Sequence, residues 1–158
     1  MKHHTYSSRV RWTGNTGQGT AHYRAYTRDW EVAVPGKPPI PCSNDPLLGG
    51  NPALMNPEDL LLSALSACHM LWYLHLAANA GIVVTAYEDS PEGTGEVAPD
   101  GAARFLSATL RPRITVRPGA DLDVAHAIHG QIHTVCFIAR SVNFPVRIAP
   151  EFHVSEDA

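Results

Sequence analysis

The sequence predicts an α+β fold, with antiparallel sheet and two helices in a single domain that spans residues 1–158. The predicted elements follow in the order strands, helix, strands, helix, strand, which is typical of this class. No internal repeat and no linker interrupts that order. A chain of 158 residues is also long enough for one domain that buries about two thirds of its unfolded surface.

The N-terminal third is predicted to contain strands and one long loop. Residues 6–12 and 21–34 alternate between polar and apolar side chains, as in a half-exposed strand, and a Gly-rich turn separates them. Residues 35–57 are rich in Pro, Gly and Asn, and only residues 40–42 are expected to be extended. Long loops in compact domains are often functional. We interpret Cys42, in this loop, as a small loop residue.

A helix is predicted over residues 57–79, with clear signals at its start. Asn56 is a good N-cap, Pro57 suits the first helical position, and Glu58 and Asp59 place negative charge in the first turn. The helix is long and apolar enough to raise the question of a membrane span. Because serines and histidines interrupt the apolar run, we expect a buried core or dimer helix instead, and no membrane partner.

The second half is predicted to alternate between strands and a second helix. Residues 82–87 and 105–116 have strand character, and the acidic, Gly-rich residues 88–101 are expected to form a hairpin connection. Residues 121–141 carry apolar side chains at helical spacing, and residues 143–154 return to strand. These elements complete the α+β order.

Charge and cysteine content exclude several classes of protein. The net charge is −3 and no Lys/Arg cluster is present, which argues against a nucleic-acid partner. Three cysteines is an odd number, which fits a reducing compartment better than a disulfide scaffold. We read no signal peptide at the N-terminus, and we therefore expect a cytoplasmic protein.

Two cysteines in apolar helical segments, Cys68 and Cys136, indicate thiol chemistry more than a structural disulfide. A reactive cysteine must be a thiolate, and burial in an apolar helix disfavours that form. A cation or a hydrogen bond must therefore offset the burial. His69 points about 100° away from Cys68 on the helix, and His75 lies two turns further on, so neither is an obvious partner.

Several segments of the chain match one known family. Asn-Pro-Glu-Asp-Leu-Leu occupies residues 56–61, and Cys68 follows seven residues later. In the second half, His-Thr-Val-Cys ends at Cys136, and Ser-Val-Asn-Phe-Pro-Val occupies residues 141–146. Together these segments resemble the OsmC/Ohr family, the osmotically inducible and organic hydroperoxide resistance proteins. The resemblance covers nearly the whole chain.

The resemblance implies an OsmC/Ohr-like fold, with antiparallel sheets wrapped around two long central helices in an intertwined homodimer. It implies a thiol peroxidase that reduces organic hydroperoxides in oxidative or osmotic stress defence. Cys68 would be the peroxidatic cysteine, oxidised to a sulfenic acid, and Cys136 would resolve it as a disulfide. A dithiol reductant, such as a lipoylated protein, would reduce that disulfide. No cofactor and no metal are implied.

Glu58 matches the active-site glutamate of the family, which holds an arginine against the thiolate. Ten residues at a rise of about 1.5 Å put Glu58 roughly 15 Å from Cys68 on one helix. It would therefore serve the site of the partner subunit, whereas residue chemistry alone favours a role in capping its own helix. The arginine positions of the family are not matched here. The nearest candidates are Arg24 and Arg28, and we choose Arg28.

Two alternatives to an enzyme stay open. His129, His133 and Cys136 have metal-like spacing, and with Cys68 they would complete a tetrahedral zinc site. The other alternative is a non-catalytic dimer that binds a hydrophobic small molecule.

Arg140 lies four residues after Cys136 and either lowers the pKa of that cysteine or stabilises the helix C-terminus.

The peroxidase hypothesis makes three structural predictions. Cys68 and Cys136 should lie close enough for an intrachain disulfide. A homodimer interface should bury more than about 2,000 Å². Apolar walls around Cys68 would favour organic hydroperoxides over hydrogen peroxide, and the side chains expected in them are Leu65, Trp72, Ile132 and Val135.

Overall fold

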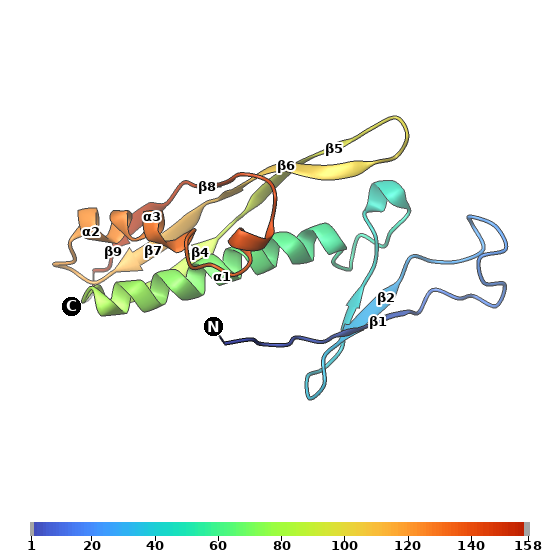
Figure 1. Ribbon diagram of the computed structural model, residues 1–158, viewed down its shortest axis with the longest axis horizontal. Helices are drawn as coiled ribbons and strands as arrows, with labels where there is room; N and C mark the ends of the chain where they lie inside the picture. The colour runs from blue at the N-terminus through green and yellow to red at the C-terminus, as the bar shows by residue number, and fades with distance from the viewer. Residues whose placement is uncertain (1, 157–158) are drawn as a thin grey trace. The chain divides into compact units, whose positions relative to one another are not determined.

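The computed structural model describes residues 2–156 and has two compact units, Met1–Leu60 and Leu61–Ala158. Figure 1 labels most of the helices and strands of both units, and the first unit runs there from blue to cyan-green. The mixture of sheets with one long helix confirms the predicted α+β class.

The first unit is built on a small antiparallel sheet. Its strands are β1 (Arg9–Trp12), β2 (Trp30–Ala33) and β3 (Ile40–Cys42), in the order β1-β2-β3, and a short 3-10 helix η1 (Pro46–Leu48) follows. The strand predicted over residues 21–34 is therefore much shorter, since the residues before β2 form turns. Cys42 is fully buried at the end of β3, opposite Trp30.

Helix α1 (Pro57–Asn79) has the predicted bounds. At its start, the Asn56 side chain accepts a hydrogen bond from the Asp59 backbone N–H at 2.8 Å, and the Asp59 carboxylate accepts one from the Asn56 N–H at 3.1 Å. This reciprocal pair is a capping box, which satisfies two N–H groups of the first turn. Gly81 follows the helix in the left-handed conformation that favours glycine.

The second unit contains two mixed sheets. One has the order β4-β7-β9 and the other has the order β5-β6-β8. Each central strand pairs antiparallel with one neighbour and parallel with the C-terminal one, so these sheets are mixed, whereas antiparallel sheet was predicted. The strands are β4 (Val84–Asp89), β5 (Glu92–Val97), β6 (Ala103–Leu110), β7 (Pro112–Val116), β8 (Val146–Ile148) and β9 (Glu151–Val154).

A line of three prolines divides these two sheets. Pro91 lies between β4 and β5, Pro112 is the first residue of β7, and Pro150 lies between β8 and β9. Proline lacks the N–H that a sheet ladder needs, so the ladder breaks where the three passes of the chain align. At this boundary between the two sheets, the Asp89 carboxylate accepts hydrogen bonds from the Arg111 backbone N–H at 2.6 Å and from the Ser66 hydroxyl at 2.5 Å. The second bond joins the boundary to α1, two residues before Cys68.

The second predicted helix, residues 121–141, is interrupted. It consists of α2 (Leu122–Ala127), α3 (His129–Ile132) and, after a turn segment, the 3-10 helix η2 (Ala139–Ser141). Gly130 and the β-branched pair Thr134 and Val135 are poor helix formers, which explains why apolar spacing alone overestimated the helix. The predicted connection over residues 88–101 also proved to contain a strand, β5.

One face of α1 forms the core of the second unit. Its buried residues recur every four positions and are Leu65, His69, Tyr73 and Ala77. The larger core cluster joins this face to strands β4 and β7 and to the α2–α3 segment. In the part of the chain that the structure describes, α1 is also the one helix long and apolar enough to cross a membrane. Core helices of soluble proteins have the same length and composition.

Candidate active site

The structure brings Cys68 and Cys136 together. Cys68 lies in the middle of α1, Cys136 follows α3, and their sulfur atoms are 2.7 Å apart. Both cysteines are free, and Cys136 is fully buried while Cys68 is partly exposed. The predicted proximity of these two thiols is confirmed. A disulfide needs a sulfur–sulfur distance of about 2.05 Å, so its formation requires a movement of well under 1 Å.

Apolar side chains surround the cysteine pair. Cys136 and Ile132 belong to the larger core cluster, and Cys68 and Trp72 pack against it. Leu65 belongs to a second, neighbouring cluster. Val135 is 40% exposed and belongs to neither core cluster, so its place in the wall stays a prediction.

Burial controls the protonation of Cys136. It raises the pKa of the Cys136 thiol to about 11, and the hydrogen bond to Cys68 adds to the shift. The backbone N–H of Ala139, which donates to the Cys136 sulfur at 3.4 Å, opposes it only in part. Arg140 is exposed in η2 and is not among the causes of this shift. At neutral pH, Cys136 therefore keeps its proton and donates it towards the Cys68 sulfur.

Beside the cysteines lies a buried pair of histidines that sequence reasoning missed. His69 Nε2 and His129 Nδ1 are 2.9 Å apart, and the two rings are parallel within 5° at a centroid distance of 5.2 Å. Tyr73 stacks on His129 at 4.5 Å. The four-residue spacing of the buried positions on α1 was the signal that places His69 on the core face.

Both histidines of this pair are neutral at pH 7. Burial lowers the pKa of His69 to about 4, although the nearby Asp89 partly opposes the shift. Burial, together with the neighbouring imidazoles of His69 and His126, lowers the pKa of His129 to about 3. The pair therefore supplies no positive charge to the thiols. The Nε2 atom of His129 is buried without a hydrogen-bond partner within the described residues.

The zinc site considered from the sequence is not formed. His133 is exposed, and the Nδ1 atom of His129 bonds to His69 rather than facing the thiols. Between residues 2 and 156, no group of three or more His, Cys, Asp or Glu side chains could hold a metal ion. The interruption of the helix after α3 removes the regular spacing on which that site depended.

Glu58 is exposed in the first turn of α1. The capping role that residue chemistry favoured for it belongs instead to Asp59, which completes the capping box with Asn56. The Glu58 carboxylate is therefore not needed to cap its own helix. Its role at a site in the partner subunit stays a prediction.

Arg28 belongs to the first unit and is held there by two tyrosines. Its guanidinium lies 3.9 Å from the ring centroid of Tyr23 and 4.6 Å from that of Tyr26. It also donates hydrogen bonds to the backbone carbonyls of both tyrosines. Cation–π contacts of this kind fix the position of an arginine without neutralising its charge. A role for Arg28 beside Cys68 stays a prediction.

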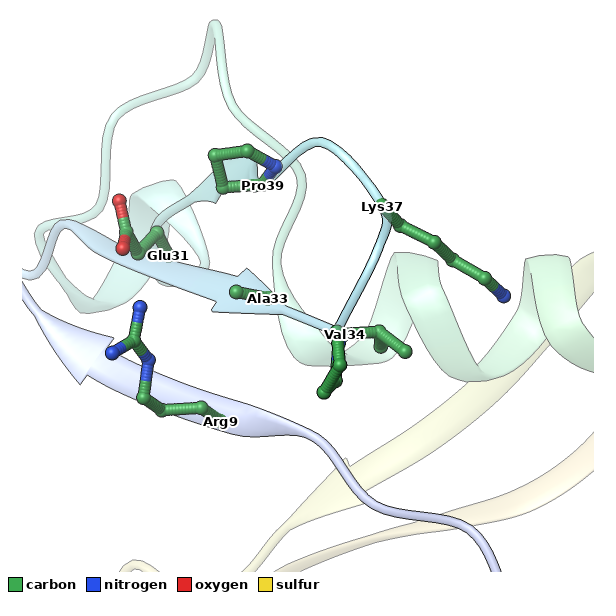
Figure 2. A pocket seen from close by; sticks show the side chains of 7 residues that line it. Arg9, Glu31, Ala33, Val34, Lys37 and Pro39 are labelled. Atoms are coloured by element: carbon green, nitrogen blue, oxygen red, sulfur yellow. The ribbon is translucent and has the colours of Figure 1, made fainter.

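The first unit has a surface hollow of about 440 Å³, which Figure 2 shows from close by. Its lining contains no thiol and no imidazole, and Lys37 extends away from the other labelled side chains. The hollow therefore offers no redox chemistry of its own. The lining residues are Arg9, Glu31, Ala33, Val34, Pro35, Lys37 and Pro39.

The chain is similar to solved structures of one fold. An OsmC-like protein of unknown function from Vibrio cholerae has 25% identity and a TM-score of 0.83, with 96% of this chain and 100% of that chain covered. An organic hydroperoxide resistance protein from Elizabethkingia anophelis has 18% identity and a TM-score of 0.71, with 96% and 99% covered. An organic hydroperoxide resistance protein OsmC from Legionella pneumophila has 18% identity and a TM-score of 0.68, with 98% and 100% covered.

Comparison of the sequence with family models identifies the family of this chain. No curated protein matches the chain. The model of the family described as OsmC-like protein matches residues 49–151, which is more than half of the chain and includes both Cys68 and Cys136. The predicted resemblance is thereby confirmed, and this chain belongs to the OsmC-like protein family.

Proposed function

We propose that this protein is a thiol-dependent peroxidase that reduces organic hydroperoxides in oxidative or osmotic stress defence. Family membership supports a stress-related peroxidase in general terms. The observation that carries the specific proposal is the 2.7 Å contact between the sulfur atoms of Cys68 and Cys136 in an apolar setting. A peroxidatic cysteine and a resolving cysteine need this proximity.

In the proposed first step, the Cys68 thiolate attacks the outer oxygen of the hydroperoxide. The O–O bond breaks, Cys68 becomes a sulfenic acid, and the alkoxide leaves as an alcohol after taking up a proton. The thiol of Cys136 donates a hydrogen bond to the Cys68 sulfur, and this contact holds the second thiol beside the reacting one. The apolar side chains around the pair favour an alkyl group, since burial of each CH₂ is worth about 0.8 kcal/mol.

In the second step, Cys136 attacks the sulfenic acid sulfur of Cys68. A disulfide forms, and the hydroxyl leaves as water with the proton of the Cys136 thiol. A dithiol reductant, such as a lipoylated protein, then exchanges with this disulfide and restores both thiols. The net reaction converts one hydroperoxide and one dithiol reductant into an alcohol, water and the disulfide form of the reductant.

The proposal includes a homodimer in the cytoplasm, with residues 1–158 as a single domain. Only 22% of the apolar stretch of α1 is buried within this chain, and Leu71 on this helix is 63% exposed. A second copy of the chain would cover such a surface. In the dimer, Glu58 of the partner subunit would orient Arg28, and that guanidinium would stabilise the Cys68 thiolate.

Stopped-flow oxidation followed by steady-state turnover with a dithiol tests this function. We expect faster oxidation by tert-butyl hydroperoxide than by hydrogen peroxide. Cys68→Ser should abolish turnover, while Cys136→Ser should allow one round of oxidation without recycling. Cys42→Ser is the matched control, because it removes the third thiol, which is also buried, and it should retain wild-type turnover. Unchanged turnover in Cys68→Ser would contradict the assignment.

The second candidate function is a non-catalytic dimer that binds a hydrophobic small molecule. It is favoured by one observation: within residues 2–156, Cys136 is the single side chain that hydrogen-bonds to the Cys68 sulfur, and it is not a cation. If neither hydroperoxide oxidises Cys68, while an apolar fluorescent probe binds with a defined stoichiometry, this second function becomes the better one.

A further inference from the structure

We propose that the buried histidine pair, His69 and His129, is a positioning element that sets the distance between the Cys68 and Cys136 sulfurs. The inference deepens the proposed function, since it concerns the same thiol pair. Both histidines are at least nine-tenths buried, with exposed fractions of 5% and 7%. Neither has a role in the chemical steps described above.

The geometry of the two pairs is the first argument. His69 follows Cys68 directly in α1, and His129 is the first residue of α3, the segment that leads to Cys136. The hydrogen bond between the histidines therefore joins the same two segments that the thiol contact joins. A shift of α3 relative to α1 would have to break the imidazole contact as well as separate the sulfurs.

The second argument is that Cys136 is rigidly attached to α3. Its backbone N–H donates to the Ile132 carbonyl at 2.8 Å, and Ile132 is the last residue of α3 and fully buried. The position that His129 fixes at the start of α3 is thus transmitted through α3 and the turn that follows it to Cys136. No other helix lies between α3 and Cys136, so α3 is the element that positions this cysteine.

The third argument is the cost of a polar pair in this core. Aromatic or aliphatic side chains would fill the same volume without leaving the His129 Nε2 atom unpartnered. An apolar contact permits sliding, whereas a hydrogen bond between two particular ring atoms has one preferred length and direction. The pair therefore contributes a defined geometry more than it contributes stability.

The disulfide equilibrium of the thiol pair with glutathione tests this role directly. In that reaction one oxidised glutathione converts the two protein thiols into the disulfide and yields two reduced glutathiones. Measured on the full chain, His69→Leu and His129→Phe should each lower the equilibrium constant by at least tenfold. His129→Phe keeps an aromatic ring for the stack on Tyr73, although a slightly larger one, and removes both ring nitrogens.

Two further variants separate positioning from general stability. In His69→Gln the side-chain amide can donate to His129 Nδ1 in place of the ring, so the equilibrium constant should return to within about threefold of wild type. Tyr73→Phe removes another buried hydrogen bond from α1, the 3.1 Å contact with the Ala125 carbonyl in α2. It should lower the thermal midpoint but leave the disulfide equilibrium unchanged.

The inference is overturned if His69→Leu and His129→Phe are folded and keep the wild-type equilibrium constant. It is also overturned if His69→Gln and His69→Leu have the same effect, since general destabilisation would then explain both. Should the two apolar variants fail to fold, His69→Asn takes their place: its amide is one methylene shorter than that of His69→Gln and does not reach His129 Nδ1, so the equilibrium constant should fall at least tenfold, and a wild-type value would overturn the inference. No hydroperoxide is used, so a wild-type protein that forms the disulfide but lacks turnover would refute the proposed function alone.

Discussion

Acidification should destabilise this protein through its histidine pair, His69 and His129. The pKa values of the two imidazoles are about 4 and about 3 in the folded protein, whereas an unfolded histidine has a pKa of about 6.5. Between these limits the unfolded chain binds protons that the folded chain does not. The two imidazoles therefore leave the free energy of unfolding at its full value above about pH 6.5, and this free energy falls as the pH falls towards 4 and 3.

The magnitude follows from the same values. Each histidine changes the unfolding free energy by at most about 1.4 kcal/mol per pH unit in this window. Two independent sites would give at most about 7 kcal/mol between pH 6.5 and pH 4. We expect roughly half, about 3 kcal/mol, because the two rings share one hydrogen bond and can share one proton. That loss is a large part of the stability of a typical domain.

Urea unfolding at pH 7, 6, 5 and 4, followed by circular dichroism and tryptophan fluorescence, measures this loss. The double variant His69→Leu/His129→Leu should lose most of the pH dependence, and its difference from the wild type isolates the pair from all carboxylates. His133→Leu is the matched control, since it removes an exposed histidine from the same segment. A wild-type unfolding free energy that is constant from pH 7 to pH 4 would refute the reasoning, as would an equal slope in the double variant.

Three further perturbations test the fold. Asp59→Ala and Asn56→Ala should each cost about 1 kcal/mol in chemical unfolding, with less than additive loss when combined, because they share one capping box; full additivity would contradict the pairing. Ile132→Ala should cost about 2 to 5 kcal/mol, because the side chain is fully buried, and a cost below 1 kcal/mol would show that the site is not packed as described. Burial raises the pKa of Tyr73 to about 12, so Tyr73→Phe should reduce the loss of stability between pH 10 and pH 12 in alkaline unfolding experiments, and an unchanged loss would exclude this cause.

Local sequence signals predicted α1 well because several of them coincide. Asn56 at the cap, Pro57 at the first position and Gly81 after the last turn each have a physical preference for that place. The α+β class followed from the order of the elements. The division of residues 121–141 was not predicted, since apolar spacing continues through the break at Ile128, between α2 and α3, and only the low helix propensity of nearby Gly130 marks it.

Contacts between distant segments were harder to predict. Strand β8 pairs parallel with β6, and β9 pairs parallel with β7. Both pairings depend on where the chain returns to each sheet, which no local pattern specifies. Cys68 and Cys136 were paired through the family resemblance rather than from residue chemistry. The contact between His69 and His129 joins residues 60 positions apart and had no motif to indicate it. The role of Asp59 rather than Glu58 in capping depended on a side-chain geometry that both residues could adopt.

Disulfide mapping after oxidation tests the central claim most directly. The reduced protein is treated with one equivalent of tert-butyl hydroperoxide, free thiols are alkylated, and the peptides are identified by mass spectrometry. Cys68 and Cys136 should be joined within one chain, and Cys42 should be the remaining thiol that is alkylated after unfolding. An oxidised protein without the Cys68–Cys136 bond, or with Cys42 in the disulfide, would contradict the proposed peroxidase.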